Sequence, residues 1–562
     1  MAERHDKHTG DSSGSLAAAS ESLRDKAKTL FQYHMRRLTL PEFVMAAILI
    51  ITGVLMRTVH IVFREMFGNE FRTLDYLEGK IGAIDVFSGV MPLYYWIIDA
   101  WASCVGTSSD LLLRLPSVIF GLATLLCIFI FAQRFLRGIA FISALLVFCL
   151  NPILIAASNQ ATPFALLGLI ATLSCYFTVI ALNKGGLRNW IGMAVTAVLG
   201  FLTHPIFMFL TLGQMIFVAF RPARPPRAMW ITSIITGAII LSAMIFFAIL
   251  GQEHFKIIES NIPALDDVTY SLVAVICGDF DRYWNTEFIR AFLYMAVFAM
   301  LIISFYYYWQ RQVEDNALPD GVIWIDDTAD IVQNWRRLSL ATFMRLHWIT
   351  FAVPVFGIFI IASCIKGIDL TPEQFIICLP PFAILFASGV DYAPGKYTKY
   401  ILTCIFAATM IVYGINTVAD NGYGVEKLSH KLNDLSFDST KDKLIVAYYR
   451  DNIKPSFDRY GINKVQFIPL DKNAEQREIN TIVDQAVGNV ERAFVFYVDD
   501  FTKKHVGGET SNMSFVRVWF NYHQNLFPTA KSWRLSRPEK AELVVYTHEN
   551  STDENTTTEQ TK

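Results

Sequence analysis

The sequence has few charged residues, and this shortage excludes most soluble protein classes. Asp, Glu, Lys and Arg make up 17% of the 562 residues, whereas 53% are hydrophobic and the mean hydropathy is +0.37. A soluble globular domain carries roughly 25% charged residues. This composition excludes a disordered chain, a small disulfide scaffold and an ordinary cytosolic enzyme. It favours a polytopic membrane protein.

Cysteine and several catalytic signatures are also scarce. The chain has 8 cysteines, and none follows Cys404, where a hydrophilic tail begins. Disulfides are therefore not expected in that tail. The sequence contains no His/Cys pair at metal-ligand spacing, no Gly-x-Ser-x-Gly motif and no Walker-type glycine-rich loop. No visible ligand set thus requires a metal.

Long apolar runs dominate the sequence instead of such motifs. The first begins near Phe43 and reaches about Phe63, which is long enough to cross the hydrocarbon core as a helix. No secretory signal peptide precedes it, and residues 1–40 are expected to form a cytoplasmic, partly disordered N-terminus, because basic residues lie just before the first run. Further apolar runs lie at about residues 91–105, 115–133, 138–158, 161–182, 188–204, 205–220, 228–250, 288–309, 347–365, 374–390 and 398–418. Residues 41–418 are therefore predicted to hold about 11–13 transmembrane helices, with the short run 91–105 undecided between a crossing and an interfacial segment.

Basic loops orient these helices and place the hydrophilic tail outside. Arg221, Arg224 and Arg227 mark a cytoplasmic loop, so the loop 64–90 and the chain after residue 418 are expected on the extracytoplasmic side. Within residues 419–548, short apolar segments alternate with a helical pattern, which predicts a small α/β domain. The segments are Leu444–Tyr449, Val465–Ile468, Ala493–Tyr497 and Leu543–Tyr546 as strands and Ile479–Val487 as a helix. Residues 549–562 are rich in Thr, Glu and Asn and are expected to be disordered.

The first outside loop carries the candidate chemistry. Its carboxylates include Asp75, which could take a proton from a hydroxyl, and Arg72 could pair with a phosphate. The alternative interpretation is a solvated loop with incidental charges. Tyr94 and Tyr95, which follow the loop, are of the type that anchors a helix at the membrane interface. His204 is placed at the tip of a hairpin, where a polar helix end is the simpler explanation.

Several short motifs occur in a fixed order between residues 71 and 182. They are Leu74-Asp75, Met91-Pro92-Leu93-Tyr94-Tyr95, Arg114-Leu115-Pro116-Ser117 and Ser158-Asn159-Gln160-Ala161-Thr162-Pro163-Phe164, with Thr203-His204 further on. In order and spacing this series resembles the GT-C superfamily, and within it the bacterial relatives of protein O-mannosyltransferase and aminoarabinose transferase. That family shows an Asp-Glu pair in its first outside loop, then a His-Pro-Pro-Leu-Tyr-Tyr-like segment, an Arg-Leu-Pro-Ser and a Ser-Gln-x-Ala-Arg-x-Tyr-like stretch.

The resemblance implies a GT-C-like membrane glycosyltransferase. It would move a sugar from a polyprenyl-phosphate donor to a lipid, glycan or protein acceptor on the outer face of a bacterial inner membrane. Asp75 would be the general base. Donor or acceptor would be bound by Arg72, Tyr76, Glu78, Tyr94, Tyr95, Arg114 and His204. The resemblance implies no nucleotide cofactor, because the lipid-linked donor is itself a substrate. As partners it implies membrane lipids and other envelope proteins, and no nucleic acid.

Three departures from the family pattern keep two alternatives open. Tyr76 replaces the Glu of the acidic pair, Thr162 replaces the Arg of the later stretch, and Glu373 stands where the family often has Arg. One alternative is a catalytically degenerate accessory or scaffold subunit of an envelope-glycan machine. The other is a transporter or flippase of a lipid-linked substrate, although transporters usually contain inverted repeats and none is visible in this sequence.

Overall fold

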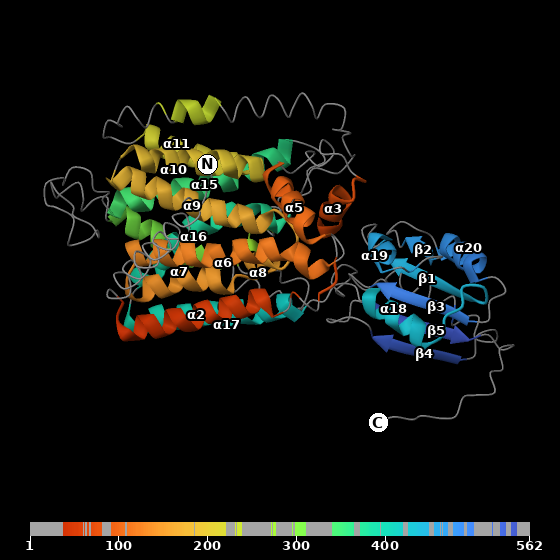
Figure 1. The fold of residues 1–562 in the computed structure, drawn as a ribbon. Helices are drawn as coiled ribbons and strands as arrows, with labels where there is room; N and C mark the ends of the chain where they lie inside the picture. Colours follow the sequence, from red (N-terminus) through yellow and green to blue (C-terminus); the bar gives the residue numbers. More distant parts are fainter. Residues whose placement is uncertain are drawn as a thin grey trace, which may run out of the picture.

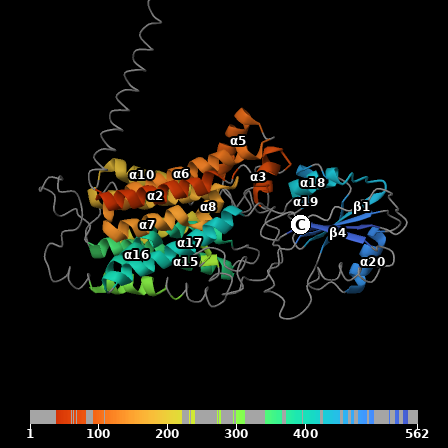
Figure 2. The same cartoon turned by 90° about the horizontal axis from the view of Figure 1, so that it is seen from below.

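The computed structural model has two parts, a bundle of long helices and a small α/β domain beside one end of it (Figures 1 and 2). We call the end of the bundle that meets the α/β domain the junction end. The structure describes residues 38–59, 61, 64–66, 69–80, 92–106, 109–184, 186–220, 231, 233–238, 271–272, 274–276, 295, 298–310, 340–364, 371–393, 395–419, 425–448, 454–460, 462, 465–469, 476–487, 492–498, 520, 529–534 and 541–547.

The bundle consists of helices that lie side by side, and two short helices sit at its junction end (Figure 1). The long-helix region comprises α2 (Leu40–Thr58), α6 (Asp110–Phe135), α7 (Gly138–Leu150), α8 (Pro152–Ser158), α9 (Phe164–Lys184), α10 (Leu187–Thr203), α11 (Phe207–Ala219), α15 (Leu340–Cys364), the 3₁₀ helix η2 (Pro372–Cys378), α16 (Leu379–Tyr392) and α17 (Lys396–Ala419). The two short helices are α3 (Asn69–Leu77) and α5 (Pro92–Val105).

Membrane-spanning helices confirm the predicted polytopic membrane fold. Among the described residues, 6 helices are long and apolar enough to cross a membrane, or up to 7 if the pair α7 and α8, bent by 46°, forms one span. The undecided run 91–105 forms α5, whose 14 residues are short for a full crossing. The predicted total of about 11–13 crossings stays a prediction, because much of 228–250 and part of 288–309 lie outside the described residues, as do residues 1–37, 311–339 and 549–562.

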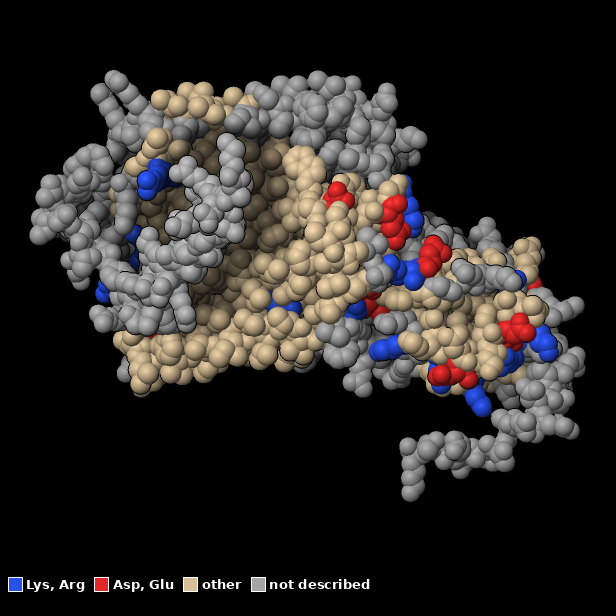
Figure 3. All heavy atoms as spheres, viewed as in Figure 1, with Lys and Arg blue, Asp and Glu red and all other residues tan. Residues whose placement is uncertain are grey.

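The flank of the bundle presents apolar side chains, as lipid contact requires. Along α2, the side chains of Ile48, Ile51 and Leu55 are exposed by 52%, 59% and 52%. In the space-filling view, described Lys, Arg, Asp and Glu residues gather at the junction and on the α/β domain, and further Lys and Arg residues lie at the opposite end of the bundle (Figure 3). The side of the bundle between its two ends is almost free of described charged residues (Figure 3). This division between an apolar flank and a charged junction is typical of an integral membrane protein with one aqueous domain.

The bundle is broken at Asn151-Pro152, and this break shapes the candidate site. Pro152 lacks an N–H group and so suits the first turn of α8. The Asn151 side-chain oxygen caps that helix by accepting a hydrogen bond from the Leu154 N–H at 3.0 Å. Asn151 and Pro152 set the start of α8, which is short and ends at Ser158. The turn from α8 to α9 then places residues 159–163 at the junction end of the bundle (Figure 1).

Close approach between α6 and α8 depends on Gly121. A Cβ atom added there would lie 2.2 Å from the Ser158 Oγ and 2.8 Å from its Cβ. Gly121→Ala is therefore expected to cost about 1–3 kcal/mol of stability through overpacking, measured as a lower thermal unfolding temperature in detergent. Gly237→Ala is the matched control, because a Cβ at Gly237 meets nothing within 4 Å. Equal unfolding temperatures for the two variants would contradict this packing argument.

The α/β domain is a five-stranded mixed sheet with the strand order β2-β1-β3-β5-β4. Parallel pairs join β1 (Asp442–Tyr448), β2 (Val465–Pro469) and β3 (Arg492–Val498), whereas β5 (Ala541–Thr547) and β4 (Thr529–Arg534) add antiparallel strands. One face of the sheet packs against α18 (Val425–Asp434) and α19 (Lys454–Arg459), and α20 (Gln476–Val487) connects β2 to β3. The four predicted strands and the predicted helix are confirmed, β4 is an addition, and the bounds 419–548 of the domain stay a prediction.

Candidate active site

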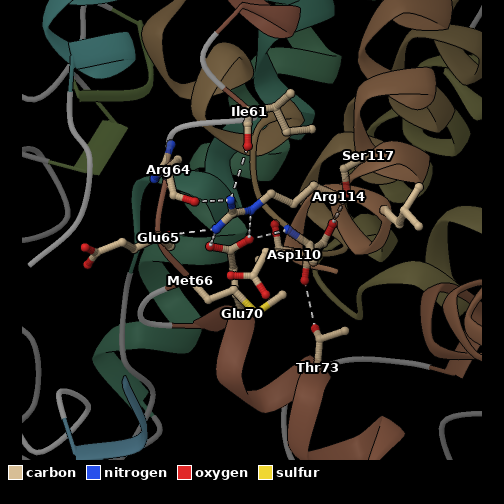
Figure 4. A network of polar contacts seen from close by, with 12 residues as sticks. Ile61, Arg64, Glu65, Met66, Glu70, Thr73, Asp110, Arg114 and Ser117 are labelled. Carbon is tan, nitrogen blue, oxygen red and sulfur yellow. Dashed lines mark hydrogen bonds and ion pairs between the residues drawn. The ribbon is translucent and has the colours of Figure 1, made fainter. Parts of the chain in front are cut away.

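A buried ion pair anchors the first loop to the bundle. The Arg114 guanidinium on α6 binds both carboxylate oxygens of Glu70 on α3, with Nε–Oε1 at 2.7 Å and Nη2–Oε2 at 2.9 Å. Both side chains are fully buried. A bidentate pair of this kind fixes orientation as well as distance. It therefore fixes how α3 lies on the end of α6 (Figure 4).

The chain between α2 and α3 wraps around the same guanidinium. Arg114 donates to the backbone oxygens of Glu65 at 2.7 Å and of Ile61 at 3.5 Å, and it also donates to the backbone oxygen of Arg64. In the close-up these carbonyls surround Arg114, while the Glu65 carboxylate points away from it (Figure 4). Arg114 thus satisfies backbone groups that would otherwise be buried without partners.

The turn between α8 and α9 completes this arrangement. The Ala161 N–H donates to Glu70 Oε1 at 2.9 Å, and the Thr73 hydroxyl donates to the Ala161 backbone oxygen at 2.8 Å. Ser117 on α6 donates to the backbone oxygen of Thr162 at 3.4 Å. The first loop, the Arg-Leu-Pro-Ser segment and the Ser-Asn-Gln-Ala-Thr segment, which are far apart in the sequence, therefore meet at one place.

Asp75 lies on a different side of α3 from Glu70. Its side chain is 30% exposed, and its Oδ1 is 3.6 Å from the Lys80 Nζ, which is itself 2.8 Å from Glu78 Oε2. Such exposed ion pairs are weak and rearrange readily. Glu78 follows the last residue of α3 and is exposed. The two acids are therefore accessible to solvent, unlike Glu70.

Tyrosines from α3 and α5 form an aromatic cluster next to this surface. The ring centroids of Tyr76 and Tyr95 are 5.0 Å apart, and those of Tyr95 and Tyr94 are 5.8 Å apart, both in edge-to-face geometry. Burial, and then the Asp99 carboxylate, raise the pKa of Tyr76, so this hydroxyl keeps its proton at neutral pH. Arg72 acts electrostatically on the Tyr95 hydroxyl. Tyr94 and Tyr95 are themselves buried, so among these residues only Arg72 and Tyr76 share the part-exposed side of α3 with Asp75.

The structure groups most of the candidate residues and separates two. Six of them belong to α3, α5 or the turn after α3, namely Arg72, Asp75, Tyr76, Glu78, Tyr94 and Tyr95. Arg114 is fully buried beneath them. His204, at the end of α10, is buried against the Phe164 ring, with centroids 6.0 Å apart, and its Nδ1 accepts the Ile206 N–H at 3.2 Å. These contacts tie His204 to the hairpin between α10 and α11.

Sequence reasoning missed Glu70, although a signal for it exists. A buried arginine needs an acidic partner, and Glu70 is an acid of the same loop that carries Asp75. Among the residues that the structure describes, no three His, Cys, Asp or Glu side chains come together as a metal site would require.

A match to one protein family agrees with the sequence resemblance over part of the chain. Residues 90–251 match the model of the dolichyl-phosphate-mannose-protein mannosyltransferase family. A comparison with curated protein sequences finds no match.

Among solved structures, the apo form of ArnT from Cupriavidus metallidurans is similar over 89% of this chain and 97% of its own, at 10% identity and a TM-score of 0.45. The Archaeoglobus fulgidus oligosaccharyltransferase is similar over 80% of this chain and 68% of its own, at 8% identity and a TM-score of 0.41. With TM-scores below 0.5, these similarities do not bear on the function. The family match over residues 90–251 agrees with the resemblance of this membrane protein to glycosyltransferases of the protein O-mannosyltransferase type.

Proposed function

We propose that the chain transfers a sugar from a polyprenyl-phosphate donor to a lipid, glycan or protein acceptor on the extracytoplasmic face, with Asp75 as the general base. The acceptor hydroxyl gives its proton to Asp75 while its oxygen attacks the sugar carbon. The bond from that carbon to the phosphate oxygen breaks, and polyprenyl phosphate leaves. Direct displacement inverts the configuration at the sugar carbon.

One observation supports this proposal above the others, namely that α3 holds one acid fixed and leaves another accessible. Glu70 is occupied by Arg114 and the Ala161 N–H, so it has no free role as a proton acceptor. Asp75 is only loosely paired and faces the aqueous side. Arg72, one helical turn before it, supplies a cation suited to a phosphate, and Tyr76, whose ring packs against Tyr95, supplies a hydroxyl donor.

The decisive experiment supplies purified protein with a panel of polyprenyl-phosphate sugars and candidate acceptors. Release of free polyprenyl phosphate that depends on the acceptor is the expected result. The inverted anomeric configuration of the product provides a second, independent readout. A protein that binds the donors but releases no polyprenyl phosphate with any acceptor would refute the enzymatic proposal and favour the accessory role.

A second candidate function is the catalytically degenerate accessory subunit, and the position of Glu70 favours it. Because Glu70 contacts the Arg-Leu-Pro-Ser segment, Asn69-Glu70 is a second possible match for the Asp-Glu pair of the family, with an amide in place of the first acid. Under this alignment the base that the family usually has is missing. Either Asp75 replaces that base, or the chain lacks transfer activity.

The substitution Asn69→Asp separates these two candidates. If the chain is degenerate, Asn69→Asp should create or raise release of polyprenyl phosphate by roughly 10²-fold or more, because it supplies a general base. If Asp75 is the base, the same change should leave transfer unchanged or lower it, because it adds a negative charge next to the Glu70 pair. The measurement is the initial rate for Asn69→Asp, for Asp75→Asn and for the double variant, each with its unfolding temperature.

A further inference from the structure

Among the described residues, charged and polar side chains join the α/β domain to the bundle. Arg459 Nη2, at the end of α19, lies 2.7 Å from Asp110 Oδ1 at the start of α6. The hydroxyl of the next residue, Tyr460, donates to Asp110 Oδ2 at 3.3 Å. The Arg459 and Asp110 side chains are 17% and 23% exposed, so this pair is largely shielded from water. Shielding makes such a contact stronger than one on an open surface.

The same domain also holds the first loop directly. The Tyr460 hydroxyl accepts a hydrogen bond from the Met66 N–H at 3.2 Å. The carboxylate of the preceding residue, Glu65, accepts one from the Val425 N–H at 2.9 Å, where α18 begins. On the opposite side, the backbone oxygen of Glu65 accepts from Arg114 at 2.7 Å. The dipeptide Glu65-Met66 is therefore held between Arg114 and the α/β domain.

Together these contacts hold the residues that position α3. Asp110 and Arg114 are one turn apart on α6, so they lie on the same face of that helix. Met66 precedes α3 by only a few residues, and α3 carries both Glu70 and Asp75. A displacement of about 1 Å at a reacting group can cost 10²-fold in rate. The orientation of α3 thus matters to any reaction at its surface.

We propose that Arg459 and Tyr460 of the α/β domain are positioning residues, which fix the first loop and α3 on the bundle by holding Asp110 and Met66. The domain then forms one structural unit with the loop that carries the candidate base. The effect on sugar transfer rests on the proposed function, whereas the effect on the order of the loop does not.

Hydrogen exchange of the full-length protein in detergent tests the structural part. Tyr460→Phe keeps the ring and removes both hydrogen bonds of the hydroxyl, and Arg459→Gln removes the ion pair. In both variants the backbone amides of residues 64–77 should exchange roughly 10-fold faster. This ratio corresponds to a loss of about 1.4 kcal/mol in the free energy that opposes opening of the loop. Arg459→Lys, which keeps the charge, should restore part of the protection.

Arg492→Gln is the matched control within the same domain. Arg492 pairs with Asp442 through Nε–Oδ1 at 2.9 Å and Nη2–Oδ2 at 2.7 Å, and this pair joins two strands of the sheet. Its loss should destabilise the α/β domain and leave the exchange of residues 64–77 unchanged. Unchanged exchange in both Tyr460→Phe and Arg459→Gln would overturn the proposal, and so would equal acceleration by Arg492→Gln.

Turnover provides the second readout. With an active donor and acceptor pair, Tyr460→Phe should lower kcat by about 10-fold and change the KM for the donor less than twofold, because the loss is one of positioning. If the wild-type protein shows no transfer, the proposed function fails and the exchange result still decides the positioning role. Faster exchange with an unchanged kcat would confirm the hold on the loop and refute its importance for transfer.

Discussion

Asp75→Asn is expected to lower sugar transfer by roughly 10²–10⁴-fold, because an amide of the same shape cannot accept the acceptor proton. The fold should be unaffected. The Asp75 side chain is 30% exposed and its contact with Lys80, at 3.6 Å, is weak. The measurement is the initial rate of polyprenyl-phosphate release, with the thermal unfolding temperature recorded in the same detergent.

Glu78→Gln is the matched control for this loss. Glu78 lies in the turn directly after α3 and binds the same Lys80 Nζ at 2.8 Å, so its substitution removes a similar surface charge. A general base at Asp75 predicts a much larger loss with Asp75→Asn than with Glu78→Gln, because Glu78 is a candidate binding residue and not the base. Equal effects would mean that the loop charge matters and not a base. Full activity of Asp75→Asn would exclude Asp75 from the chemistry.

Most of the fold could be predicted because its signals are local. Apolar runs predicted the long helices, and four buried β-strands were predicted from apolar segments such as Ala493–Tyr497, which is completely buried in β3. The strand β4, with the sequence Thr529-Ala-Lys-Ser-Trp-Arg534, has polar residues at most positions and carries no such signal. It forms because β5 offers it a free edge to pair with. Pairing of this kind is a property of the assembled sheet and is not visible in the segment itself.

The candidate site could be located but not resolved from sequence. The motifs identified the first loop, and the structure places Arg72, Asp75 and Tyr76 on one short helix, α3, with the buried Tyr95 ring packed against Tyr76. A buried arginine signals an acidic partner in this loop, but which acid turns inward could not be read from the sequence, because the acids of a polar loop look alike until the helix orientation is fixed. That orientation is set by Arg114, whose partners lie up to 53 positions away in the chain. Contacts from the α/β domain, such as that of Tyr460 with Met66, are more distant still.

Loss of either member of the Glu70–Arg114 pair is expected to destabilise the protein by about 3–5 kcal/mol, because it leaves a buried charge without a partner. Arg114→Met should be the more severe change. It leaves the Glu70 carboxylate unpaired and also removes the donors to the Ile61, Arg64 and Glu65 carbonyls. Glu70→Gln should cost less, because its side-chain oxygen can still accept the Ala161 N–H.

Thermal unfolding in detergent of both single variants and the double variant measures the coupling between the two residues. For residues in direct contact, the double variant should be more stable than the sum of the single losses predicts. Lys80→Ala is the control for an exposed ion pair and should change the unfolding temperature little, since the Lys80 side chain is 61% exposed. If Glu70→Gln proved as mild as Lys80→Ala, the pair could not be what holds α3 on the bundle. The accessible position of Asp75 would then need another support, and the candidates among the described residues would be the Thr73–Ala161 hydrogen bond and the contacts made by Arg459 and Tyr460.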